Sequence, residues 1–178
     1  NNASINASSE GAGGITCTNG CKEGGNGIYT PGFVIECINK GAIYTSGYNS
    51  AGIVSMNASW ENESYGFICN SYNSGIISGG RSQCAGIVAD TGWNGGSGYI
   101  YNCYNNIARS STGGTDILWR GHSSCEIKQC GNYTDGTSID ILNASVSNIP
   151  ALLTNTGLYR SNAWVSKDNK IFLDWEVE

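Results

Sequence analysis

Two stretches of the chain share one pattern: GFVIECINKGAIYTSGYNSAGIV at residues 32–54 and GFICNSYNSGIISGGRSQCAGIV at residues 66–88. Both begin with Gly-Phe, carry Asn-x-Gly in the middle and end with Ala-Gly-Ile-Val. A fixed period of this length, with short apolar and β-branched segments, is typical of proteins built from stacked repeats. The two stretches are therefore interpreted as copies of one structural unit.

More divergent copies lie on both sides of this pair. A third copy, GYIYNCYNN, begins at Gly98, and TDILW at residues 115–119 stands where Ala-Gly-Ile-Val stood before. A fourth, CEIKQCGNYTDG, covers residues 125–136, and GAGGIT at residues 11–16 is an earlier partial copy. We therefore assign residues 1–137 to the repeats.

The apolar residues of each copy alternate in the way expected of short strands. In the first copy the predicted strands are residues 33–37, 42–45 and 51–55, separated by Gly, Asn and Ser turns. No helix of ordinary length fits between residues 11 and 136, because glycine interrupts every window. Three short strands joined by tight turns form one coil of a β-helix. The sequence thus predicts an all-β solenoid of about four to five coils.

Stacking such coils at about 4.8 Å places equivalent residues of successive coils in columns. One coil cannot bury its apolar face alone, so the apolar columns must pack together. Asparagines in one column can bond to one another through their side-chain amides, which is a structural role. The predicted columns are two apolar ladders and one asparagine ladder: Val34, Ile68 and Ile100; Ile53, Ile87 and Ile117; and Asn39, Asn73 and Asn105.

The pattern ends at residue 138, after which glycine becomes scarce. In residues 138–178, NIPALLTNTG predicts a short helical turn that ends at Gly157, and NAWVSKDNKIFLDWEV predicts two aromatic-rich strands. We expect this segment to be a C-terminal cap that covers the open edge of the last coil. At the other end, NNASINASS either forms the first coil or leaves an edge that something else covers.

The order of motifs, Ala-Gly-Ile-Val and then G-F/Y-I-x-N-x-Y-N-x-G-x-I-S-G, resembles the GLUG-type β-helix repeats of secreted and cell-surface proteins. The closing strands with Leu173 and Trp175 look like the segment that follows such repeats, so the resemblance covers residues 11–178. Family units carry a further Gly where Ser55 and Ala89 stand here. The resemblance implies a right-handed, surface-exposed β-helix within an adhesin or an appendage of a larger enzyme. It does not imply catalysis by the repeats.

Composition favours an exported protein of one domain. Charged residues make up 13% of the 178 residues, whereas apolar residues make up 39% and recur periodically. The net charge of −5 and the absence of a basic stripe argue against a nucleic-acid partner. No apolar run is long enough to span a bilayer, and the first residue is not Met, so a mature or excised form is expected.

An even number of cysteines in such a chain predicts disulfides and an oxidising compartment. The competing interpretation is zinc, from one Cys-x3-Cys pair and one Cys-x4-Cys pair, but neither spacing is usual and only one histidine is present. Column positions favour a Cys103–Cys130 disulfide and, more weakly, Cys37–Cys69. The eight candidates are Cys17, Cys21, Cys37, Cys69, Cys84, Cys103, Cys125 and Cys130.

The chain also contains six Asn-x-Ser/Thr sequons, although a composition rich in Asn, Ser and Thr produces several by chance. Asn57 and Asn62 are expected in an exposed loop after Ala-Gly-Ile-Val, and Asn132 after a strand. The candidate N-glycosylation sites are Asn2, Asn6, Asn57, Asn62, Asn132 and Asn143.

Catalytic patterns are weak. His122, the single histidine, has no nucleophile partner in its motif, and no nucleophile elbow, phosphate loop or zinc-protease motif is present. Asp90 and Asp116 flank equivalent strands and could form a carboxylate pair for glycoside cleavage, but solvated turn aspartates are the simpler explanation. We therefore predict no enzyme activity, no cofactor and no metal site.

The loops after Ala-Gly-Ile-Val vary between copies, and such insertions commonly form the interaction face of a repeat protein. They place Trp60, Trp93 and Trp119 as candidate binding-face aromatics for sugar rings, unless these residues only cover a corner of the coil. Two functions follow. The first is an extracellular or cell-surface structural or adhesive module, including a filament subunit that contacts a neighbouring chain at its uncapped N-terminal end. The second is a carbohydrate-binding module or an appendage of a surface enzyme.

Overall fold

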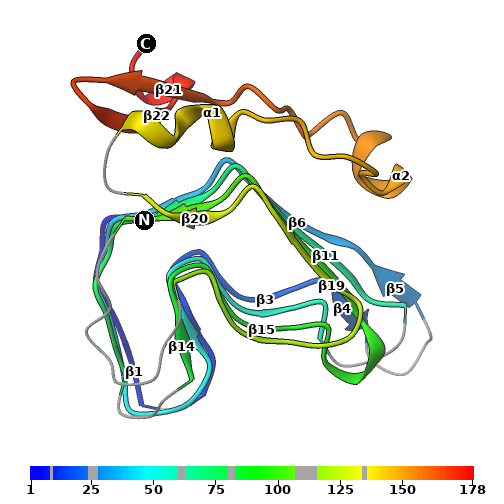
Figure 1. Ribbon diagram of the computed structural model, residues 1–178. Coiled ribbons are helices and arrows are strands. Elements are labelled where there is room, and N and C mark those ends of the chain that lie inside the picture. The colour runs from blue at the N-terminus through cyan, green and yellow to red at the C-terminus, as the bar shows by residue number, and fades with distance from the viewer. Residues whose placement is uncertain (9, 24–27, 60–62, 80–82, 107–115, 134–135) are drawn as a thin grey trace.

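The computed structural model describes residues 1–8, 10–23, 28–59, 63–79, 83–106, 116–133 and 136–178. The fold is all-β, and most strands belong to parallel sheets in which neighbouring strands come from successive repeats. The repeats therefore lie over one another as matching layers (Figure 1). The four repeats end near Asn39, Asn73, Asn105 and Asn132, which occupy equivalent positions.

Five parallel sheets run along the stack. The first three contain β1 (Ile5–Ala7), β8 (Ile43–Thr45) and β13 (Ile77–Gly79); β2 (Ala12–Gly13), β9 (Ser50–Ala51) and β14 (Cys84–Ala85); and β3 (Thr16–Asn19), β10 (Val54–Asn57), β15 (Val88–Thr91) and β18 (Leu118–Gly121). The other two contain β6 (Gly32–Ile35), β11 (Tyr65–Cys69), β16 (Ser97–Tyr101) and β19 (Cys125–Lys128); and β7 (Ile38–Asn39), β12 (Tyr72–Asn73), β17 (Tyr104–Asn105) and β20 (Gly131–Asn132).

The remaining elements are short. Two antiparallel hairpins join β4 (Cys21–Glu23) to β5 (Ile28–Thr30) and β21 (Trp164–Lys167) to β22 (Lys170–Leu173). The helices are α1 (Ile139–Leu142), α2 (Ala151–Thr154) and the 3₁₀ turns η1 (Trp93–Gly95), η2 (Gly136–Ser138) and η3 (Asp174–Glu176). The predicted helical turn before Gly157 and the two predicted C-terminal strands are thus confirmed, and α1 was not predicted.

The predicted columns are confirmed. Ile68 is in register with Val34 on one side and with Ile100 on the other, and all three are buried in one core cluster. Ile53 and Ile87 are fully buried in the same cluster, with Ile117 packed against it. The prediction of three strands per repeat was too coarse, because the complete repeats contain five short strands. The strand predicted over residues 33–37 ends at Ile35 in β6, because Glu36 turns the chain with a φ of +53°, and β7 begins only at Ile38.

The asparagine ladder is hydrogen-bonded from Asn1 to Asn105. Nδ2 of Asn39 donates to Oδ1 of Asn73 at 2.8 Å, and Nδ2 of Asn73 donates to Oδ1 of Asn105 at 2.9 Å. Asn1 extends the ladder by one step, since its Nδ2 donates to Oδ1 of Asn39 at 2.9 Å. The N-terminal residues therefore form part of the first repeat, in agreement with one of the two alternatives for that segment, and β1 pairs with β8.

The glycine of Ala-Gly-Ile-Val packs directly against this ladder. A Cβ added at Gly52 would lie 2.3 Å from Cγ of Asn73 and 2.1 Å from the carbonyl oxygen of Gly86. Gly14 meets Asn39 in the same way, and Gly86 meets Asn105, each with a Cβ position 2.5 Å from the amide carbon. The two repeat motifs are therefore halves of one contact between segments on opposite sides of each repeat.

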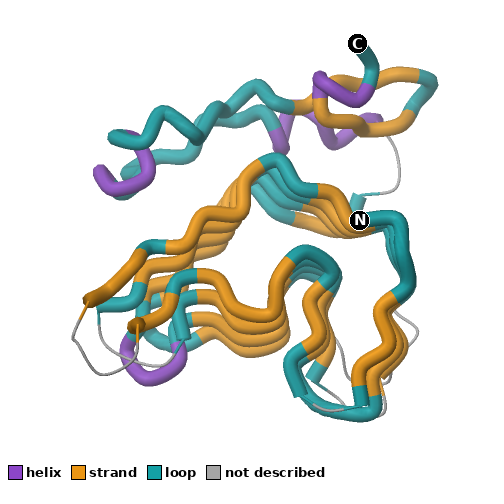
Figure 2. The backbone as a smooth tube through the Cα atoms, turned by 180° about the vertical axis from the view of Figure 1, so that it is seen from behind, coloured by secondary structure: helices purple, strands orange, loops and turns teal. Residues whose placement is uncertain are grey.

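The C-terminal segment, residues 138–178, lies along the side of the stack (Figures 1 and 2). Its contacts reach several repeats: the side-chain amide of Asn102 donates to the carbonyl of Ala144 at 3.1 Å, that of Asn70 donates to Arg160 at 2.8 Å, and Lys40 pairs with Glu176 at 3.0 Å. The prediction that this segment covers the open edge of the last coil was therefore wrong. It covers a lateral face that spans the repeats.

The reason for this placement is the second apolar face of the sheet that contains β6, β11, β16 and β19. Val34, Ile68 and Ile100 point into the stack, whereas alternate residues on the same strands point outward. Those outward residues include Phe67 and Tyr101, each fully buried, and Val146 and Leu153 of the C-terminal segment pack against them. The rings of Phe33, Phe67 and Tyr99 also stack on one another, with centroids 5.2 and 4.9 Å apart.

The seven cysteines whose side chains the structure describes are free thiols, so the predicted disulfides are absent among them. Cys103 and Cys130 are adjacent in one column, but the backbone N–H of Cys103 donates to Sγ of Cys130 at 3.3 Å. Both thiols donate to the carbonyl two residues earlier, at 3.2 Å, as the hydroxyl of Ser71 does in the same column. Cysteine here takes the hydrogen-bonding role of serine, and Cys21 lies in β4, outside the described side chains.

Replacing Asn73 by Ala should remove about 3 kcal/mol of stability, because the substitution leaves ladder donors and acceptors unpaired at a fully buried position. Urea unfolding followed by circular dichroism measures this change. Asn132→Ala, at the exposed end of the same column, is the matched control and should cost less than about 0.5 kcal/mol. Equal losses in the two variants would show that the ladder does not stabilise the stack.

Native thiol labelling should follow burial. Burial raises the pKa of the Cys69 and Cys103 thiols, so these groups stay protonated and shielded, whereas Cys17 is exposed. We expect iodoacetamide to modify Cys17 rapidly and Cys69, Cys84 and Cys103 only after unfolding, as measured by peptide mass spectrometry without reductant. Failure of Cys103 and Cys130 to react in denaturant would instead demonstrate a disulfide.

Candidate functional site

A small cleft lies on the sheet formed by β3, β10, β15 and β18. Met56, Asp90 and Arg120 come from three successive repeats and are in register, so their side chains form a row across this sheet. Glu10 and Asn49 lie in the turns before β2 and β9, and Trp93 follows β15 in η1. Together these six residues line a cleft of about 150 Å³. It therefore combines charged, amide and aromatic groups in one place.

Asp90 is the most buried residue of the cleft lining, with a side chain that is 3% exposed. Nε of Arg120 donates to its Oδ2 at 3.0 Å, and Nη2 of Arg120 donates to the same oxygen. Nε2 of His122 lies 3.3 Å from Oδ1, close enough for an ion pair when the imidazole is protonated. Neither Oδ1 nor Nε2 has a hydrogen-bond partner among the described residues, so the two groups approach without hydrogen-bond alignment.

Asn49 adds a second buried acceptor to the cleft. Its Oδ1 is shielded from solvent and has no hydrogen-bond donor within the described part of the chain. The residue has a φ of +55°, a left-handed conformation that asparagine tolerates better than most residues. Buried acceptors without donors are costly, so a site that contains two of them favours a ligand that brings donors.

The predicted binding-face tryptophans have different outcomes. Trp93 is partly buried and lines the cleft, after Gly92 turns the chain with a φ of +74°. Trp119 is also partly buried, and the guanidinium carbon of Arg120 lies 5.3 Å from its ring centroid. Trp60 lies outside the described residues. Of the described tryptophans predicted for a binding face, Trp93 therefore lines the cleft, whereas Trp119 contacts its Arg120.

The suggested carboxylate pair is not found. Asp90 is in register with Arg120, and Asp116 lies two residues before the equivalent of Val88 at Leu118. His122, which has no partner in its own motif, lies beside Asp90 in space. Sequence reasoning missed this cluster since the partners are 30 and 32 residues apart (90 to 120 and 90 to 122) and only the repeat register joins them.

The described candidate glycosylation sites divide into buried and exposed asparagines. Asn57 lies in β10, is fully buried, and its Nδ2 donates to Gly66 and Thr91 at 3.1 Å, so its predicted exposure was wrong. Asn143 is partly buried, and its amide bonds the backbone of Trp164 in both directions. Asn62 lies outside the described residues. The exposed sequon asparagines are Asn2, Asn6 and Asn132.

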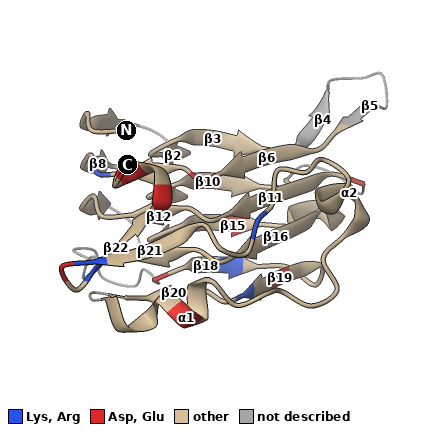
Figure 3. Cartoon of the chain, turned by 90° about the horizontal axis from the view of Figure 1, so that it is seen from above, with Lys and Arg blue, Asp and Glu red and all other residues tan. Residues whose placement is uncertain are grey.

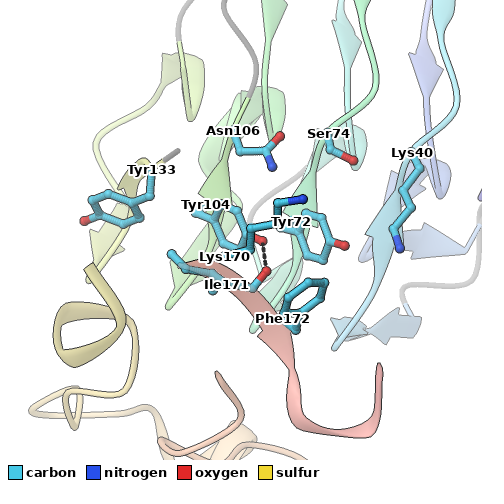
Figure 4. Close-up of a pocket in the computed structure, with 9 residues that line it drawn as sticks. All are labelled: Lys40, Tyr72, Ser74, Tyr104, Asn106, Tyr133, Lys170, Ile171 and Phe172. Carbon is cyan, nitrogen blue, oxygen red and sulfur yellow. Dashed lines mark hydrogen bonds between the residues drawn. The ribbon is translucent and has the colours of Figure 1, made fainter. Parts of the chain in front are cut away.

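A larger pocket of about 230 Å³ lies between the repeats and the C-terminal hairpin (Figure 4). The hydroxyl of Tyr104 donates to the carbonyl of Ile171 at 2.9 Å, and that of Tyr72 donates to Glu176 at 3.0 Å. Burial raises the pKa of both tyrosines, and the Glu176 carboxylate raises it further, so the hydroxyls remain donors. Trp164 packs edge-on against both rings. These contacts attach the hairpin to the repeats. The pocket is therefore a gap in a packing interface rather than a ligand site.

Arg160 forms the main charged link between this segment and the repeats. Its guanidinium bonds the carboxylate of Glu36 at the corner after β6 and that of Asp174 in η3, with Nη2 distances of 2.7 Å to each. The hydrogen bonds from Arg160 hold the pKa of Asp174 below its usual range. One side chain thus connects residues that are far apart in the sequence.

Comparisons of the chain with protein-family models, with curated proteins and with solved structures find no match. The resemblance to GLUG-type repeats therefore stays a prediction. Within the described ranges, no helix is long and apolar enough to cross a membrane. The same ranges contain no group of three histidine, cysteine or acidic side chains placed to hold a metal ion.

Acid should loosen the C-terminal segment. The folded-state pKa of Asp174 is lowered, so its stabilisation is complete above the usual aspartate pKa of about 3.9 and is lost as the pH falls through the lower folded value. Limited proteolysis with an acid-active protease should release residues 138–178 faster at pH 3 than at pH 5. Arg160→Met should release them at neutral pH, with a loss of about 1 kcal/mol, whereas Lys167→Met should not. Unchanged cleavage in Arg160→Met would contradict this role.

Proposed function

We propose that the chain is a right-handed β-helix of about four coils that acts as a structural or adhesive module outside the cell or at its surface. The observation that carries this proposal is the pair of open ends. At one end Ile15 is 37% exposed, although Ile53 beside it is fully buried. At the other end Ile127 is 43% exposed, although Ile100 beside it is fully buried. Each apolar ladder therefore stops at a residue that a further layer would cover.

The backbone of the strands at the two ends also favours end-to-end assembly. The edge strands of a stack present N–H and C=O groups that another strand can pair, and this is the usual route to end-to-end assembly. Asn1 and Asn132 lie at the two exposed ends of the asparagine column, so the side-chain ladder can also continue. The partner is a second copy of this chain or further repeats of the same type.

Surface chemistry is consistent with an extracellular setting. Charged residues are sparse over the parallel sheets (Figure 3), and the chain is rich in Gly, Ser and Asn. Two sequon asparagines away from the end of the asparagine column, Asn2 and Asn6, are exposed and accessible to a glycosylating enzyme. Carbohydrate binding is the second candidate function, and the cleft that contains Trp93 and the unpaired acceptors of Asp90 and Asn49 favours it.

Blocking one end should prevent assembly. We expect the purified chain to form fibres or short end-to-end oligomers in negative-stain electron microscopy and light scattering. Ile127→Lys places a charge at the end of the apolar ladder and should leave monomers with unchanged circular dichroism, because the position is already 43% exposed.

Leu158→Lys is the matched control, since Leu158 is 49% exposed but lies on the lateral C-terminal segment. This variant should assemble as the parent chain does. A parent chain that stays monomeric at all concentrations would rule out self-assembly. Equal assembly of Ile127→Lys and the parent would show that this end is not the contact.

A further inference from the structure

We infer that the cleft formed by Glu10, Asn49, Met56, Asp90, Trp93 and Arg120 binds a single neutral sugar ring. The inference rests on the carbohydrate-binding candidate and is independent of the end-to-end assembly. The cleft is built by the repeat register, because Met56, Asp90 and Arg120 are consecutive members of one column. Its position is therefore fixed by the sheet rather than by loops alone.

The polar groups of the cleft select a ligand with hydrogen-bond donors. Oδ1 of Asp90 and Oδ1 of Asn49 are both shielded acceptors without a hydrogen-bond donor among the described residues. Asp90 is 2% exposed, Arg120 donates to its Oδ2, and Nε2 of His122 lies 3.3 Å from its Oδ1 without forming a hydrogen bond. Sugar hydroxyls satisfy such acceptors and can accept in turn from the guanidinium or the amide.

The charge of the cleft argues against anions. Glu10 and Asp90 each contribute one negative charge and Arg120 one positive charge, which leaves the lining with a net charge of −1 when His122 is neutral. The positive charge of Arg120 is already balanced by Asp90, so the guanidinium has no excess charge for an anion, although its remaining N–H groups can still donate to a neutral ligand. The same guanidinium disfavours a second cation at this carboxylate. A neutral ligand fits these charges best.

The apolar part of the lining suits the C–H face of a sugar ring. Trp93 and Met56 contribute an indole ring and a thioether to the same cleft as the acceptors. Hydroxyl donors on one edge and an apolar face on the other are the combination that a pyranose presents. The volume of about 150 Å³ provides room for one ring rather than for a longer chain.

The test is binding of methyl hexopyranosides, namely the glucoside, galactoside and mannoside, to the full chain. Saturation-transfer NMR detects contact, and calorimetry measures affinity. At least one hexoside should bind, and Trp93→Ala should weaken it by about tenfold or more. Trp175→Ala, an aromatic 49% exposed on the C-terminal segment, is the matched control and should bind as the parent does.

A second variant tests the acceptor. Asn49→Gly keeps the left-handed backbone and removes the amide, so it should fold normally and weaken hexoside binding by about tenfold. The inference is overturned if no hexoside binds, if the Trp93 and Trp175 variants bind alike, or if methylamine or methyl glucuronide binds in place of the neutral sugars. Repeating the titration with Ile127→Lys separates this outcome from that of assembly, because that variant keeps the cleft whether or not the chain forms fibres.

Discussion

The contact on which the stack depends joins the asparagine ladder to the glycine of Ala-Gly-Ile-Val. Each ladder asparagine lies where a side chain at that glycine would otherwise be, with Asn73 against Gly52 as the central example. The close approach lets the amide bond its neighbour above and below at 2.8–2.9 Å while the backbone of the facing segment closes over it. Gly14, Gly52 and Gly86 are matched in this way with Asn39, Asn73 and Asn105, because a side chain at each glycine would collide with the ladder amide. This constraint sets the register for every other column.

The strand register also decides which side chains become neighbours in each column. Where a column contains apolar residues it becomes core, as for Val34, Ile68 and Ile100. Where it contains Met56, Asp90 and Arg120, the same geometry places unlike residues side by side at the spacing of strands in a sheet. The cleft is thus a local break in a repeating pattern. Repeat proteins commonly place recognition in such variable positions, because the invariant columns are occupied by packing.

Much of the stack follows from the sequence by alignment of its copies. The period, the three predicted columns and the strand character of Trp164–Lys167 and Lys170–Leu173 were all readable from it. The disulfide prediction was wrong for the described cysteines. It rested on their even number, whereas the thiol of Cys103 takes the hydrogen-bonding position that the hydroxyl of Ser71 has in the same column. The predicted exposure of Asn57 was wrong because it rested on the sequon alone. Asn57 belongs to a second buried column, in which it is hydrogen-bonded to Asn19 and Thr91.

The sequence by itself determined the repeat and the ladders, since both depend on residues at a fixed spacing. Only the tertiary structure decided the path of the C-terminal segment, where Glu176 meets Lys40 across 136 residues and Arg160 meets Glu36 across 124. Lateral packing of this kind depends on which apolar face remains uncovered, and no local periodicity records it. The pairing of Asp90 with Arg120 and its approach to His122 have the same origin. Their types were visible in the sequence, but their proximity follows from how the repeats are stacked.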